Sequence, residues 1–137
     1  MNTNAAVAAN LSEMLEDLGG IPAARICVEP APGHATIEDL IRLNGQGGMF
    51  ELVDATLVEK AMGWRESLIA SLLCELLRQY LRHNDLGLVS GPDGFMQILR
   101  TQVRGPDVAF VSWQRLPDGK VPDAPVPEIV PDIAIEV

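Results

Sequence analysis

Aromatic residues, cysteines and long apolar runs are all scarce in this sequence of 137 residues. Aromatics make up 4% of it, so the core has to be built mainly from Leu, Ile, Val and Ala. Cys27 and Cys74 each stand alone in an apolar context, which favours small buried side chains over a disulfide or a ligand pair. No stretch approaches the roughly 18 apolar residues of a membrane span. The polar N-terminus lacks the basic start of a secretory signal. We therefore expect a soluble, cytoplasmic protein.

Basic residues are also few, and the formal net charge of -9 argues against nucleic-acid binding. The excess of acidic over basic residues is unevenly distributed. Residues 1–59 hold nine acidic and two basic side chains, whereas residues 60–137 hold ten acidic and eight basic ones. Several acids of the second part are candidate metal ligands, and a bound divalent ion offsets two of their charges. The charge weakens a DNA-binding hypothesis without removing it.

Most familiar catalytic patterns are missing. His34 and His83 lie far apart without metal-ligand spacing, and the sequence shows neither a glycine-rich phosphate loop nor a nucleophile elbow. A recognisable base partner is also missing for Ser67, Ser71, Ser90 and Ser112. With 47% hydrophobic and 21% charged residues, the composition is nevertheless that of a globular domain. Acidic residues are left as the candidates for chemistry.

The first 48 residues are expected to form a helical appendage, and residues 49–137 the core. In the appendage, a helix over residues 5–18 is ended by Gly19-Gly20, and Thr36 caps a short helix that runs through Leu43. In the core we expect a hairpin over 50–60 and a long helix over 64–83. Strands follow at 95–100, 107–112 and 132–137, with a proline-rich loop between the last two.

Apolar residues cover more than one face of the expected long helix. A narrow stripe predicted to face the core consists of Ile69, Leu73, Leu77 and Tyr80. Leu68, Leu72 and Leu76 widen the apolar surface beyond what one core face needs, which is typical of a dimer interface. Glu66 lies on the inward side of the first turn. A carboxylate there either interacts favourably with the helix dipole or faces a polar partner or a metal ion.

Two further carboxylates stand at apolar strands. Asp107 opens one of them, and Glu136 interrupts the apolar run of the other. A solvated edge strand accounts for one such acid, but not for both. If the two strands are neighbours, Asp107 and Glu136 converge at one end of the sheet, where their repulsion calls for a cation. Mg²⁺ prefers such hard oxygen ligands, and it can activate water against a phosphodiester.

The same blocks carry a family resemblance. Phe50–Asp54, Leu57–Glu59, the long helix, Pro106–Val111 and Pro131–Val137 occur in an order and spacing that resembles the Uma-two family of restriction endonucleases. That family belongs to the PD-(D/E)XK nuclease superfamily, and the resemblance covers about residues 36–137.

The resemblance implies an α/β fold with a restriction-endonuclease-like core, a central mixed β-sheet flanked by helices. It also implies that Asp107 and Glu136 bind the metal ion, Mg²⁺ or alternatively Mn²⁺, and that Glu66 assists them in catalysis. Asp132 is given a structural or supporting role, and Glu51 and Glu59 structural roles in the hairpin. The implied activity is that of an endonuclease, a hydrolase that acts on DNA phosphodiester bonds.

Two departures from the family pattern matter. Ala55 replaces the usual glycine after Asp54, which predicts a different turn geometry. The sequence also stops at Val137, before the basic residue, helix and strand that family members add. We therefore expect an incomplete core that is nearly inert as a nuclease and a homo-oligomer that covers the exposed sheet edge. The alternative is a non-catalytic binding or assembly module on the same fold.

Substitution of either ligand is expected to leave the metal-free protein at least as stable as before. Asp107→Ala and Glu136→Gln each relieve carboxylate repulsion, so neither should lower the melting temperature.

Overall fold

The computed structural model describes residues 10–137 as an α/β fold with three α-helices and two antiparallel sheets. The helices are α1 (Leu11–Asp17), α2 (Ile37–Gly45) and α3 (Trp64–Leu81). The strands are β1 (Phe50–Val53), β2 (Thr56–Glu59), β3 (Gly87–Ser90), β4 (Met96–Leu99), β5 (Gln102–Arg104), β6 (Val108–Ser112) and β7 (Ile133–Ile135). Short 3₁₀ turns lie at Ala23–Arg25, Trp113–Arg115 and Pro117–Gly119.

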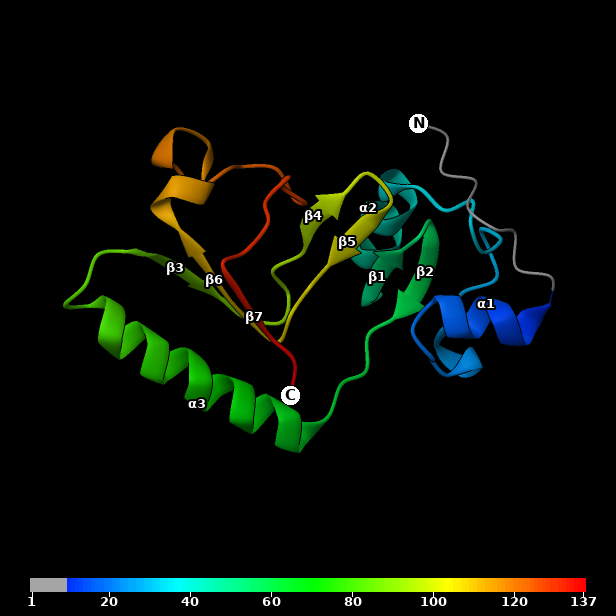
Figure 1. Ribbon diagram of the computed structural model, residues 1–137, viewed down its shortest axis with the longest axis horizontal. Coiled ribbons are helices and arrows are strands. Elements are labelled where there is room, and N and C mark those ends of the chain that lie inside the picture. Colours follow the sequence, from blue (N-terminus) through cyan, green and yellow to red (C-terminus); the bar gives the residue numbers. More distant parts are fainter. Residues whose placement is uncertain (1–9) are drawn as a thin grey trace.

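The strands divide into a four-stranded sheet of order β2-β1-β5-β4 and a three-stranded sheet of order β3-β6-β7. Figure 1 shows the two sheets next to one another, with α3 running along the three-stranded sheet and α1 and α2 lying by the other. The expected α/β, restriction-endonuclease-like class is confirmed. The pairing between strands is antiparallel throughout, and a single isolated bridge between Gln97 and Glu128 is parallel. Within residues 10–137, no helix combines the length and apolar character needed to cross a membrane.

Local signals fix the starts of the first two helices. Asn10 caps α1, whose expected beginning at residue 5 lies outside the described residues. Thr36 caps α2 through the predicted capping box, in which its hydroxyl accepts from the Asp39 N–H and the Asp39 carboxylate accepts from the Thr36 N–H. Leu40 of α2 is fully buried in the same cluster as Leu52 of β1. The proposed division at residue 48 stays a prediction.

Aliphatic side chains form the core, as the scarcity of aromatics predicts. The cluster at the four-stranded sheet contains Ala35, Leu40, Leu52, Leu57 and Val103. A second cluster, around β6, contains Met96, Ala109, Val111, Leu116 and Ile129. A third, beneath α1, contains Leu18, Val53 and Val58. Strand β6 is the central strand of its sheet, and Val108 and Ala109 on its two faces are both fully buried.

Helix α3 presents a different face to the sheet from the predicted one. The residues turned toward the protein are Ala70, Leu73, Cys74, Leu77 and Leu81, whereas Ile69 and Tyr80 are 49% and 59% exposed. The predicted stripe was therefore wrong at both of its ends. Leu68, Leu72 and Leu76 are all more than half exposed, as a face outside the core requires. Because α3 is apolar on two sides, its sequence period alone does not decide which side packs.

Two strands were missed by the sequence patterns. Strand β3 pairs with β6, and β5 lies between β1 and β4. Both are short, and β5 has polar residues at its two ends, Gln102 and Arg104. The side chain of Val103, between them, is fully buried against Leu52. One buried residue is too little for a period to show in the sequence.

The β1–β2 turn contains two residues in the left-handed region, Asp54 at φ 47° and Ala55 at φ 56°. A two-residue hairpin turn with positive φ at both positions suits glycine at the second position. Ala55 adopts this conformation, although an L residue with a Cβ is strained in it. The consequence of the alanine is strain in a tight turn, since the hairpin register is uninterrupted up to Val53 and Thr56.

Ala55→Gly is expected to stabilise the protein by about 1 kcal/mol, because it removes the cost of a left-handed alanine. Thermal unfolding should show a melting temperature higher by about 3 °C. Ala124→Gly is the matched control, since Ala124 is exposed in a loop and is not among the residues with positive φ. A control that stabilises as much as Ala55→Gly would contradict the strain.

Candidate active site

Asp107 and Glu136 lie opposite each other at one end of the three-stranded sheet. Strands β6 and β7 pair antiparallel with Val108 opposite Ile135, so the next residues outward are Asp107 and Glu136. Directly opposed residues point to the same face, with Cβ atoms roughly 5 Å apart. The Val137 N–H donates to Asp107 Oδ2 at 2.9 Å, which holds the two chain segments together beyond the strands. The two predicted ligands thus come from neighbouring strands.

A buried lysine pairs with Asp107. Lys60 directly follows β2, its side chain is 6% exposed, and its ammonium lies 3.1 Å from Asp107 Oδ1. The same ammonium donates to the carbonyl oxygens of Gly105 and Pro92, so that all three of its protons have acceptors. An ion pair this deeply buried joins the four-stranded sheet to the start of β6.

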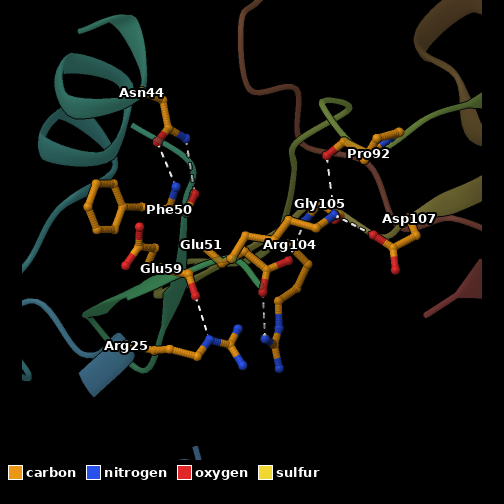
Figure 2. A network of polar contacts seen from close by, with 10 residues as sticks. Arg25, Asn44, Phe50, Glu51, Glu59, Pro92, Arg104, Gly105 and Asp107 are labelled. Atoms are coloured by element: carbon orange, nitrogen blue, oxygen red, sulfur yellow. Dashed lines mark hydrogen bonds and ion pairs between the residues drawn. The ribbon is translucent and has the colours of Figure 1, made fainter. Parts of the chain in front are cut away.

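Glu51 of β1 forms the second arm of the network. Its carboxylate accepts from the Gly105 N–H at 2.8 Å and from the Arg104 guanidinium at 3.2 Å. Figure 2 shows these groups together, with Glu51, Arg104 and Asp107 arranged around Gly105. Glu51 is buried, so these donors replace the hydration that its carboxylate loses on folding. Asp107 and Glu51 are thus each paired with a cation, Lys60 and Arg104 respectively. Glu136 is a third carboxylate that feels the charges of all four groups.

Glu136 carries the uncompensated charge of the group. Partial burial raises the pKa of Glu136 above its ordinary value, and the negative charges of Glu51 and Asp107 raise it further. The positive charges of Lys60 and Arg104 act in the opposite direction but do not cancel this rise. The end of β7 is thus a place where an additional cation would be stabilised.

Glu66 shares a cavity with Asp107 and Lys60. The cavity, of about 860 Å³, lies between α3 and the ends of β6 and β7. Glu66 is an exposed residue, and its carboxylate lies so close over Gly63, the N-cap of α3, that a Cβ at that position would collide with it. This position suits a carboxylate that stabilises the helix dipole. The two interpretations of Glu66 are therefore compatible with one location.

Asp132 ties β7 to the far end of β6. Its carboxylate accepts from the Ser112 N–H at 2.7 Å and from the Arg115 guanidinium at 3.2 Å. The hydrogen bond from the Ser112 backbone, and with it the contact to Arg115, lowers the pKa of Asp132 below its ordinary value. Asp132 lies at the opposite end of the strand pair from Glu136, which agrees with a structural role.

The donor chemistry of the cluster fits a hard divalent cation. Asp107 and Glu136 both carry carboxylate oxygens and lie directly beyond the paired residues Val108 and Ile135. Mg²⁺ is commonly held by one or two carboxylates together with waters. Among residues 10–137, no three His, Cys, Asp or Glu side chains are grouped closely enough to hold a metal ion alone. Asp107 and Glu136 therefore stay a predicted pair of ligands, and burial together with the neighbouring acids Glu51 and Asp107 raises the pKa of Glu136, an effect that a cation there would oppose.

The α/β core is consistent with a restriction-endonuclease-like class of protein. Residues 37–137 match the model of the Uma2 family, whose description is "putative restriction endonuclease". The match covers most of the chain, which belongs to this family, and the expected resemblance is confirmed. At a coarse level it supports a nuclease. A comparison with curated proteins finds no match.

Sequence patterns did not find Lys60 and gave Glu51 a role in the hairpin alone. Strand alternation holds a usable signal for both residues. Lys60 shares the parity of the fully buried Val58, and Glu51 pairs directly with Val58 across the hairpin. Two charges on the buried face of a hairpin indicate a buried polar network. Which residues complete that network depends on long-range contacts that the sequence does not display.

This network changes what we expect of Asp107→Ala, for which the sequence alone predicts a melting temperature that stays level or rises. The expectation considered only repulsion between carboxylates, whereas Asp107 is the charged partner of a buried ammonium. Removing it leaves Lys60 buried without a counterion, which costs about 3 kcal/mol.

We predict opposite stability effects for the two acids in metal-free buffer. Asp107→Ala should lower the melting temperature by roughly 10 °C. Glu136→Gln should raise it slightly at pH 7, because the charged form of an acid with a raised pKa destabilises the folded state. That cost is fully present above the folded pKa and disappears as the pH falls below the ordinary value of 4.5. Calorimetry at pH 7 and pH 4 should therefore show a gain for Glu136→Gln at the higher pH alone. Equal melting temperatures for both variants would refute the network.

Proposed function

We propose that this protein is a metal-dependent endonuclease that hydrolyses DNA phosphodiester bonds, with Asp107 and Glu136 as the metal ligands. The observation that carries the proposal is the register of β6 and β7, which brings these two acids next to each other just beyond the last paired residues, Val108 and Ile135. Membership of a restriction endonuclease family supports DNA as the substrate, and such families generally use divalent metals. We propose Mg²⁺ as the ion, with Mn²⁺ as the alternative.

Each residue of the cluster has a distinct task in this proposal. When bound, the ion supplies a charge that polarises the phosphodiester and lowers the pKa of the attacking water. Lys60 holds Asp107 in one orientation and keeps a positive charge beside it. Arg104 and the Gly105 N–H fix Glu51, so that this carboxylate adds negative charge at the site without moving. Glu66 faces the same cavity from α3 and is proposed to assist.

Low activity of this chain also follows from the contacts of Asp107. Both of its oxygens already accept hydrogen bonds, one from Lys60 and the other from the Val137 N–H. A metal ion has to share these oxygens with two donors, which lowers its affinity. We therefore propose weak, metal-dependent nicking by this chain.

Nicking of supercoiled plasmid DNA tests the proposed function. Asp107→Asn, which keeps hydrogen-bonding atoms near Lys60, and Glu136→Gln should each reduce the rate by about 100-fold or more, since each removes a charge that acts in the transition state. Asp123→Asn is the control, because Asp123 is an exposed acid in a loop outside the cluster. Chelation with EDTA should stop nicking by the parent protein. Nicking that persists in both ligand variants would place the activity elsewhere.

A non-catalytic assembly module is the second candidate, and the charge balance favours it. Lys60 and Arg104 already neutralise Asp107 and Glu51, so the network stabilises the junction between the sheets without metal. The exposed face of α3, which consists of Trp64, Leu68, Leu72 and Leu76, offers an apolar surface for a second copy. Oligomer formation through this face is part of both candidate functions.

Light scattering at micromolar concentration should show a dimer or larger assembly. Leu72→Glu should shift it toward the monomer, because a carboxylate in the middle of an apolar interface is desolvated without a partner. Leu99→Glu is the matched control, since Leu99 is similarly exposed, at 60% against 56%, but lies at the end of β4. A monomer at every concentration, or an equal effect of both variants, would contradict the interface.

A further inference from the structure

The cavity beside the candidate site extends along most of α3. One wall is a face of this helix that begins near Glu66 and ends at Arg82. The other wall is formed by Asp107, Val137 and the turn at Gly91 and Pro92. Figure 1 shows α3 running along the three-stranded sheet, with the end of the chain next to its first turns. The candidate ligand Asp107 thus opens into an elongated groove.

Two arginines line the groove at the end of the helix. Arg78 and Arg82 are one turn apart, and both are exposed. Arg78 makes one long hydrogen bond, 3.5 Å, to the Val89 carbonyl, and Arg82 has no side-chain partner among residues 10–137. Glu75 also lines this wall, and its carboxylate accepts from the Gln79 amide. In a protein with a net charge of -9, a pair of guanidinium groups without ion-pair partners is an unusual concentration of free positive charge.

The distance from these arginines to the site matches a stretch of nucleic-acid backbone. Arg78 follows Glu66 by three to four helical turns, which is about 18 Å at 1.5 Å per residue. At roughly 3.4 Å of rise per base pair along the duplex axis, this length corresponds to about five base pairs. Guanidinium groups bind phosphate oxygens through paired hydrogen bonds. One end of the groove therefore has acidic residues that suit a metal ion, and the other end has arginines that suit phosphates.

We propose that this groove holds the backbone of the DNA strand on one side of the scissile bond, with Arg78 and Arg82 bound to its phosphates. The proposal rests on the proposed function. It adds the path along which the bound DNA strand runs away from the candidate metal ligands. The guanidinium groups of Arg78 and Arg82 support DNA as the occupant, because they complement phosphates at the end of the groove away from Glu66, while the outer side of α3 is apolar.

Binding without cleavage tests the groove independently of catalysis. Fluorescence anisotropy of a labelled 20-base-pair duplex, measured in EDTA at several salt concentrations, reports phosphate contacts directly. Arg78→Ala/Arg82→Ala should weaken binding at least 10-fold and reduce the slope of log affinity against log salt by about 2. Arg65→Ala is the matched control, since Arg65 lies on the same helix, is exposed and does not line the groove. Arg82→Ala alone should reduce the slope by about 1, and it serves if the double variant does not fold.

The outcomes separate this proposal from the proposed function. Loss of binding in the groove variants but not in Arg65→Ala supports the groove, whether or not any variant nicks DNA. Equal binding by all variants, an equal loss with Arg65→Ala, or no binding by the parent protein would overturn it. A changed oligomer size in light scattering with unchanged DNA binding would also overturn it and assign the groove to a protein contact.

Discussion

A buried lysine holds the two sheets of this protein together. Lys60, at the end of the β1–β2 hairpin, reaches across to Asp107 at the start of β6 and to the carbonyls of Gly105 and Pro92. A buried ammonium is tolerated only with such a complete set of acceptors. The Lys60–Asp107 contact therefore helps to keep the hairpin in place relative to β6, together with the hydrogen bond from the Gly105 N–H to Glu51. Fold stability and the candidate ligand depend on the same contact.

The carboxylates around this contact differ in whether a nearby cation compensates their charge. Asp107 and Glu51 each have a cation at hydrogen-bonding distance, whereas Glu136 shares their field without a cation of its own. Burial and two neighbouring acids make its charged form costly. A protein that keeps a carboxylate in such a place either tolerates the cost or offsets it with a ligand. A divalent ion between Glu136 and Asp107 is the ligand that the donor chemistry favours.

The elements that could be predicted from the sequence are those with strong local signals. In three places, a few neighbouring residues are enough to predict the local structure. These are the Thr36–Asp39 capping box, the hairpin around Asp54 and the apolar strand after Asp107. From that strand and the one expected over residues 132–137, the convergence of the two acids was also predicted, and the register of β6 and β7 brings them next to each other just beyond Val108 and Ile135.

The missed features depend on tertiary context. Strand β5 has a single buried side chain, so its pairing is decided by β1 and β4 rather than by its own pattern. Helix α3 is apolar on two sides, and the sheet selects the side that carries Ala70. The tolerance expected of Asp107→Ala left Lys60 out of account, because Lys60 comes from a segment 47 residues earlier in the chain. Such a pairing is set by the sheet arrangement and has no local signature.

Thermal unfolding of the parent protein and of Glu136→Gln as Mg²⁺ is added tests the central claim most directly. A ligand that binds the folded state alone stabilises it by about 2.7 kcal/mol at 100 times its dissociation constant. The account predicts that the melting temperature of the parent protein rises with Mg²⁺ until the site saturates, and that Glu136→Gln, although more stable without metal, stays level. An equal rise in both proteins, or none in the parent with either Mg²⁺ or Mn²⁺, would contradict a metal site at Asp107 and Glu136.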